Sequence, residues 1–92
     1  MSDREIYEKA LATWGAEAQT MMVFEEMAEL QKELCKHARG KQNTAAIAEE
    51  IADVQIMLEQ MVVLHDCAEM VERFKQDKVL RLAERIEENR HA

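Results

Sequence analysis

The sequence predicts an all-α protein, an antiparallel helical bundle of about four helices that is completed by oligomerisation. The 92 residues include no proline and only two glycines, and residue types that favour helix are abundant. Apolar residues recur at helical spacing along most of the chain. A chain of this length buries only ~60–65% of the surface that its unfolded form exposes, so a hydrophobic core built from one chain alone gives only marginal stability. We therefore expect a single domain, residues 1–92, that associates with further copies.

Two helices are expected in the first forty residues. Ser2-Asp3-Arg4-Glu5 is typical of a capping box, which starts a helix that runs to about Thr13. Gly15 is expected to end this helix in the left-handed conformation that glycine adopts easily. The second helix, residues 16–39, is amphipathic and is expected to end at Gly40 in the same way.

Two further helices follow a short loop. Asn43 or Thr44 is expected to cap the third helix, which lasts to about Leu64. This helix is apolar around most of its circumference, which predicts a central position in the bundle. A second pattern like a capping box, Asp66–Glu69, predicts the start of a fourth helix that ends near Asn89.

Charge and cysteine content narrow the function classes. Nineteen acidic and twelve basic residues give a net charge of −7, which argues against binding to nucleic acid or to anionic membranes. No stretch approaches the ~20 apolar residues of a transmembrane helix, and the N-terminus lacks a signal-peptide pattern. Two cysteines do not make a disulfide framework. These features predict a cytoplasmic protein.

Four carboxylates form two pairs on the second and third helices. Glu26 and Glu29 are three residues apart, as are Glu50 and Asp53, so the members of each pair are neighbours on one helix face. The short loop between these helices predicts antiparallel packing, which brings the pairs toward each other. Carboxylate oxygens are the ligands that Mg²⁺ or Mn²⁺ prefers. The pattern therefore predicts a metal site.

The alternative is an ordinary solvated acidic face. Lys32 and Lys36 lie near Glu29 on the second helix and would offset its charge, which favours this alternative there. The third helix favours the metal, because Glu50 lies on the helical wheel beside apolar residues and no basic residue of that helix is available to pair with it.

These acidic motifs resemble those of a known family. Phe24-Glu25-Glu26-Met27-Ala28-Glu29-Leu30, followed by Glu49-Glu50-Ile51-Ala52-Asp53-Val54, resembles the EExxE…ExxD signature of MazG-like nucleotide pyrophosphohydrolases. This all-α superfamily includes dimeric dUTPases and phosphoribosyl-ATP pyrophosphatase. The resemblance covers roughly residues 13–85 and includes Trp14-Gly15, Gln31–Leu34 and Arg39-Gly40-Lys41.

The resemblance implies a Mg²⁺-dependent hydrolase, with Mn²⁺ as a possible substitute. Its substrate would be a nucleoside triphosphate, NTP or dNTP, cleaved between the α and β phosphates into a monophosphate and pyrophosphate. The metal ligands that it implies are Glu26, Glu29, Glu50 and Asp53, and Glu25 would bind or orient the attacking water. It also implies assembly into a homodimer or homotetramer.

Four residues are candidates for substrate binding. The resemblance implies that Lys78 and Arg81 bind the phosphates. These two residues are three positions apart, whereas the corresponding pair in some family members is four apart. Their alternative role is that of exposed cations on an exposed helix. Trp14 is a candidate for stacking on the base and Gln19 for hydrogen bonding to it, and a packing anchor is the alternative for the tryptophan.

Two other functions stay open. A non-catalytic helical interaction module would keep the same fold without turnover and would not depend on a divalent ion. Phosphoribosyl-ATP hydrolysis would keep the chemistry and change the substrate.

Overall fold

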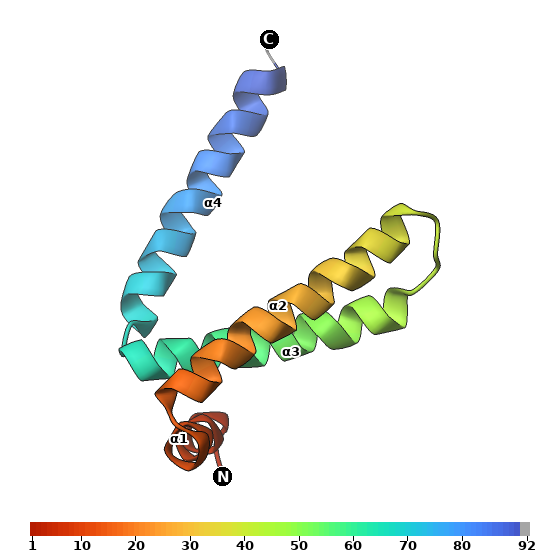
Figure 1. The fold of residues 1–92 in the computed structure, drawn as a ribbon. Coiled ribbons are helices and arrows are strands. Elements are labelled where there is room, and N and C mark those ends of the chain that lie inside the picture. Colours follow the sequence, from red (N-terminus) through yellow and green to blue (C-terminus); the bar gives the residue numbers. More distant parts are fainter. Residues whose placement is uncertain (91–92) are drawn as a thin grey trace.

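The computed structural model describes residues 1–90 and contains four α-helices, with no strand in that range. They are α1 (Asp3–Trp14), α2 (Ala16–Ala38), α3 (Thr44–His65) and α4 (Ala68–Arg90), as Figure 1 shows. The all-α class and the number of helices are confirmed.

α3 is the centre of the fold. It runs antiparallel to α2 beyond the loop at residues 39–43, and α1 packs across both helices near the start of α2 (Figure 1). α3 contacts each of the other three helices, as its apolar sequence predicts. Within the described residues α4 contacts α3 alone, and it projects away from the α2–α3 pair. One chain therefore provides a three-helix unit and a fourth helix that extends from it.

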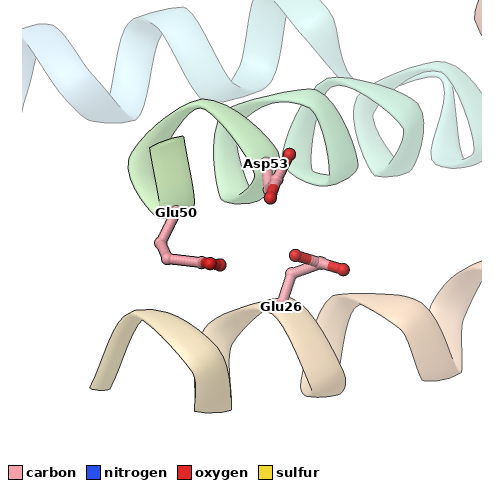
Figure 2. Close-up of side chains that lie close together, drawn as sticks. All are labelled: Glu26, Glu50 and Asp53. Carbon is pink, nitrogen blue, oxygen red and sulfur yellow. The ribbon is translucent and has the colours of Figure 1, made fainter. Parts of the chain in front are cut away.

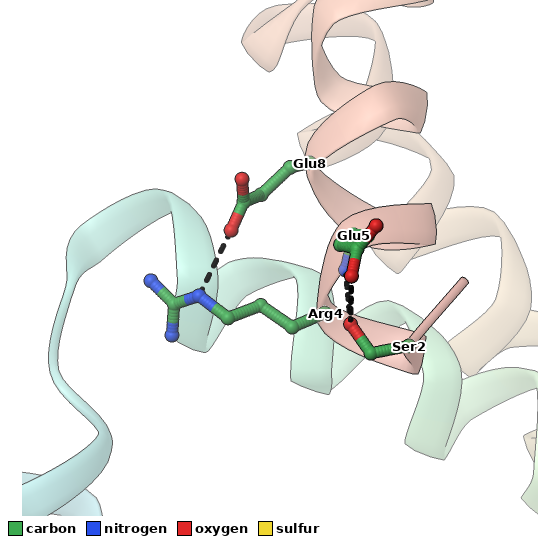
Figure 3. A network of polar contacts seen from close by, with 4 residues as sticks. All are labelled: Ser2, Arg4, Glu5 and Glu8. Atoms are coloured by element: carbon green, nitrogen blue, oxygen red, sulfur yellow. Dashed lines mark hydrogen bonds and ion pairs between the residues drawn. The ribbon is translucent and has the colours of Figure 1, made fainter.

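The first turn of α1 contains the predicted cap. The Ser2 hydroxyl oxygen accepts a hydrogen bond from the Glu5 amide at 3.1 Å, and the hydroxyl donates to the Glu5 carboxylate at 3.2 Å (Figure 3). In a capping box the glutamate would instead bind the Ser2 amide. Arg4 donates to Glu8 one turn later, with 2.9 Å between the nitrogen and the oxygen (Figure 3). The local sequence thus starts this helix without help from the rest of the fold.

Both glycines have positive φ angles. Gly40 (φ 103°) follows the last turn of α2, where the Lys41 amide bonds to the Lys36 carbonyl over 3.1 Å, so the predicted glycine cap is confirmed. Gly15 has φ 91° and ψ 155°, a positive-φ conformation open essentially to glycine alone, and not the left-handed helical one that was predicted. Its amide closes α1 and its carbonyl accepts from Gln19, which lets a single residue join two helices at a sharp angle.

Asp66 does not start α4, contrary to the capping-box prediction. It lies in the left-handed region (φ 49°, ψ 51°) and ends α3, where the amides of Asp66 and Cys67 bond to the carbonyls of Val63 and Val62 at 3.2 Å each. Aspartate is among the few residues with a side chain that tolerate this conformation. An N-terminal cap requires an extended backbone, so the same residue cannot do both.

Asn43 occupies the N-cap position before α3, as expected, but its side chain makes no capping hydrogen bond there. Its amide nitrogen instead donates to the Glu33 carbonyl at 2.9 Å and to the Glu33 carboxylate at 3.0 Å. The residue therefore fixes the loop and the start of α3 against the side of α2.

A single chain buries few apolar side chains. The buried apolar residues among those described are Val23, Val54 and Met57, which lie where α2 meets α3. Large apolar residues on all four helices are exposed by more than a third: Ile6, Trp14, Met21, Phe24, Met27, Leu34, Ile51, Ile56, Leu58, Met70, Val71, Phe74, Val79, Leu80, Leu82 and Ile86. Within residues 1–90, none of the helices combines the length and apolar character needed to cross a membrane.

Candidate metal centre

The antiparallel pairing of α2 and α3 brings three carboxylates together. Glu26 extends from α2, and Glu50 and Asp53 extend from α3 toward it (Figure 2). One oxygen from each residue lies within 4.8 Å of the corresponding oxygens of the other two. We call these three residues the carboxylate cluster. Two of its members are one helical turn apart, and the third comes from the facing helix.

Contacts on both sides of the cluster set the alignment of the two helices. Toward the loop, Asn43 is bonded to Glu33 of α2. Toward α1, the Thr20 hydroxyl contacts the Met61 sulfur at 3.7 Å. Between these points Val23 and Met57 are buried beside the cluster. The cluster therefore lies on two helices whose alignment is fixed by contacts on both sides of it.

The cluster carries uncompensated negative charge. Partial burial, and then the charges of Asp53 and Glu50, raise the pKa of Glu26 above its ordinary value of 4.5. Burial, and then the charges of Asp53 and Glu29, raise the pKa of Glu50. Every contribution to these two shifts acts in the same direction. Like charges thus gather here, and within residues 1–90 no side-chain cation contributes to either shift.

The donor set fits a hard divalent cation. Three carboxylates supply only oxygen ligands, which suit Mg²⁺ or Mn²⁺ better than metals that favour nitrogen or sulfur. One carboxylate oxygen of Glu50, Oε2, is buried without a hydrogen-bond partner among the described residues. A buried acceptor of this kind is costly unless something binds it. Proximity, charge and the unpartnered oxygen all favour a cation at this point.

The structure brings together three of the four predicted metal ligands. Glu29 is exposed and lies outside the cluster, but its charge raises the pKa of both Glu26 and Glu50, so it borders the site. Glu25, the predicted water-binding residue, is exposed on α2 and contributes to neither shift.

The predicted substrate-binding residues are dispersed in one chain. Lys78 and Arg81 line a shallow depression on α4 together with Leu82 and Arg85, on the helix that leaves the α2–α3 pair. Trp14 ends α1 with 64% of its surface exposed, so it is not a packing anchor within one chain. Gln19 is buried in α2.

Two polar features of the site were not predicted from the sequence. Glu33 has a lowered pKa, chiefly because Asn43 and then Lys36 donate hydrogen bonds to it, the latter at 3.0 Å. Gln60 of α3 is 5% exposed, and its carbonyl oxygen Oε1 has no partner among the described residues. The signal that could have found Gln60 is its position seven residues after Asp53, on the same helix face.

Comparison of the chain with protein-family models, with curated proteins and with solved structures gave no match.

Proposed function

We propose that this protein is a Mg²⁺-dependent nucleoside triphosphate pyrophosphohydrolase. It cleaves the bond between the α and β phosphates and releases a nucleoside monophosphate and pyrophosphate. The observation that carries the proposal is the convergence of Glu26, Glu50 and Asp53 across two helices, with raised pKa values on two of them. The resemblance of both acidic motifs to MazG-like enzymes supports the same activity, and we place the enzyme in the cytoplasm.

The carboxylate cluster is the part of the protein that would hold the metal. Glu26, Glu50 and Asp53 supply oxygen ligands, and Glu29 at the border supplies a fourth carboxylate when its side chain turns inward. A bound Mg²⁺ neutralises the polyphosphate and polarises the scissile phosphoryl group. Because the cluster stands on two packed helices, its ligands lose little conformational entropy when they bind.

Two further groups act on the water and the phosphates. Glu25 follows Phe24 on the exposed side of α2, next to the cluster in sequence, and its carboxylate accepts a hydrogen bond from the attacking water. Lys78 and Arg81 are donors to the phosphates, and charge stabilisation of this kind accounts for most of phosphoryl-transfer catalysis. Both cations lie on α4, which must therefore come near a carboxylate cluster in the active form.

Self-association provides this approach. The chain exposes 7422 Å² of surface, whereas a compact monomer of 10.7 kDa exposes about 5,500 Å². The excess of about 1,900 Å² per chain is on the scale of an obligate interface. A homodimer or homotetramer would cover the apolar side chains of α4, among them Phe74, and place its cations beside the cluster of another copy.

One observation favours the second candidate, a non-catalytic interaction module. Five depressions on the described residues are shallow, and the carboxylate cluster lines none of these five. A module of this kind would use the exposed apolar faces for a partner and would not need Mg²⁺.

The test is pyrophosphate release from a panel of NTPs and dNTPs with Mg²⁺, with Mn²⁺ and with EDTA. Metal-dependent release of pyrophosphate and monophosphate is the expected result. Release of orthophosphate would indicate another scissile bond and contradict the proposal. Absence of turnover on the panel and on phosphoribosyl-ATP would favour the interaction module.

A further inference from the structure

We propose that Arg85 is a third phosphate-binding residue, and that it makes the enzyme select nucleoside triphosphates over diphosphates. It acts together with Lys78 and Arg81, and we call these three residues the cation row. The inference rests on the proposed function and adds to it a residue that the sequence analysis did not include.

The three cations share one face of α4. Lys78 and Arg81 are three residues apart, and Arg81 and Arg85 are four apart, so each is next to its neighbour on the helix surface. They line one depression of about 300 Å³, and Leu82 is its fourth lining residue. That volume is at the lower end of the range for small-molecule sites. The helix rises by about 10.5 Å over the seven residues from one end of the row to the other, so the row is elongated.

The positive charges of the row are not offset. The ion pairs found within residues 1–90 include none of its members, although Asp77 and Glu84 each lie about one turn from Arg81. Arg90, by contrast, pairs with Glu87 at 3.4 Å. α4 as a whole is balanced, with six basic and six acidic residues, so the row is a local concentration of positive charge. All its members are exposed, and their N–H groups can donate to an anion.

A row of cations fits a chain of phosphates. Three linked phosphoryl groups present negative charge at three successive positions, whereas a carboxylate or a single phosphate presents it at one. A diphosphate has one phosphoryl group fewer, so one cation of the row is left without a partner when it binds. The loss of that contact is a difference in binding free energy between the two substrates, which is the physical basis of selectivity.

Arg85 is the end of the row that binds the γ phosphate. The α phosphate lies at the metal in both substrates, so they differ only at the far end of the phosphate chain. The γ phosphate is terminal and has three free oxygens, and a guanidinium can bind two of them at once through parallel hydrogen bonds. The ammonium of Lys78, at the other end of the row, is a point charge without this geometry.

The experiment compares wild type with Arg85→Gln, which removes the charge, and with Arg85→Lys, which keeps the charge and loses the parallel hydrogen bonds. Arg90→Gln is the matched control, because Arg90 is an exposed arginine of the same helix that does not line the depression. The assays are kcat/KM for a nucleoside triphosphate and for its diphosphate, and Kd by calorimetry for the α,β-methylene analogues of both with Mg²⁺. Light scattering measures whether each variant keeps the wild-type mass.

Arg85→Gln should lower kcat/KM and raise Kd for the triphosphate by about tenfold or more, with little change for the diphosphate and none in mass. Arg85→Lys should recover part of the loss, and Arg90→Gln should behave as wild type. Equal losses for both nucleotides, no loss, or a fall in mass in Arg85→Gln would overturn the inference and leave the proposed function in place. Absence of turnover in wild type would overturn the proposed function, and the Kd values of the two analogues would then decide on the row alone.

Discussion

Glu26 and Asp53 face each other from two different helices, with an oxygen of each within 4.8 Å of the other. Burial, the charge of Asp53 and that of Glu50, and a hydrogen bond with Asp53 raise the pKa of Glu26. Side chains in this relationship repel when both are ionised, so the pair is most stable when it holds a proton or a cation. Four of the predictions below follow from this arrangement or from the contacts that maintain it.

Replacing Glu50 tests the catalytic role of the cluster. Glu50→Gln keeps the shape of the side chain and removes its charge, so turnover should fall by about 10²-fold or more, while the helical circular dichroism signal stays the same. Pyrophosphate release with Mg²⁺ is the measurement. Glu72→Gln is the control, since Glu72 is exposed on α4. Wild-type activity in Glu50→Gln would remove the cluster from the mechanism.

In the absence of metal, the stability of Glu50→Gln relative to wild type is expected to depend on pH. The pKa of Glu50 is raised in the folded state from its ordinary value of 4.5, so the folded state binds more protons than the unfolded state between these two values. Its contribution to stability therefore falls as the pH rises through that window. Glu50→Gln should melt above wild type at neutral pH, and the difference should vanish below pH 4.5. A variant that melts below wild type at neutral pH would contradict this sign.

Metal binding should reverse the repulsion within the cluster. Mg²⁺ or Mn²⁺ at a hundredfold its Kd is expected to stabilise wild type by about 2.7 kcal/mol, and EDTA should abolish the effect. Asp53→Asn removes one charged ligand and should remove most of the stabilisation. Differential scanning fluorimetry across a metal titration measures both. Equal stabilisation of the variant would place the ion elsewhere.

The elements that the sequence predicted best depend on neighbours along the chain. Ser2 and Gly40 act through hydrogen bonds to residues within the same turn or the next, so their patterns were sufficient. Asp66 was wrongly predicted because aspartate serves both an N-terminal cap and a left-handed C-terminal cap, and only the backbone angle at that residue separates them. Local sequence therefore predicts the position of a helix end more reliably than the backbone conformation and the hydrogen bonds that cap it.

The site was predictable to the extent that helical spacing describes it. The cluster forms because the three-residue spacing of the acidic residues puts them on one face of each helix, and the short loop makes α2 and α3 pack antiparallel. These residues are Glu26, Glu50 and Asp53. Glu29 is exposed, since the helices meet at one angle and only part of each face points inward. Gln60 was missed, because a lone glutamine on an apolar face has no evident chemistry until its burial is known. The direction of α4 was not predictable, as it depends on packing partners beyond α3.

Asn43 is expected to stabilise the α2–α3 alignment. Asn43→Ala removes two hydrogen bonds to Glu33 and leaves the Glu33 carbonyl with one partner fewer. The expected loss is about 1–2 kcal/mol in the free energy of unfolding, measured by urea denaturation. Asn89→Ala on the exposed surface of α4 is the control and should change it little. If both variants were equally stable, the loop contact would not hold the helices in place.

The last prediction concerns the surface of α4. A helix of 23 residues whose side chains are all exposed gains little from packing, and isolated helices of this kind fray in water. Phe74 is 57% exposed, and burial of such an aromatic residue in an interface is worth several times the energy of a surface contact. Phe74→Glu should therefore reduce the mass measured by light scattering from that of an oligomer to the 10.7 kDa of one chain.

The control for Phe74→Glu is Gln76→Glu, which adds the same charge at an exposed polar position of α4 and should leave the oligomer intact. Loss of assembly should also lower the helical content, because α4 loses its packing, and lower turnover, because Lys78 and Arg81 no longer reach a second chain. A wild-type protein that is monomeric at assay concentration and still fully active would show that one chain completes the site by itself. In that case α4 would have to fold back onto its own α2–α3 pair when substrate binds.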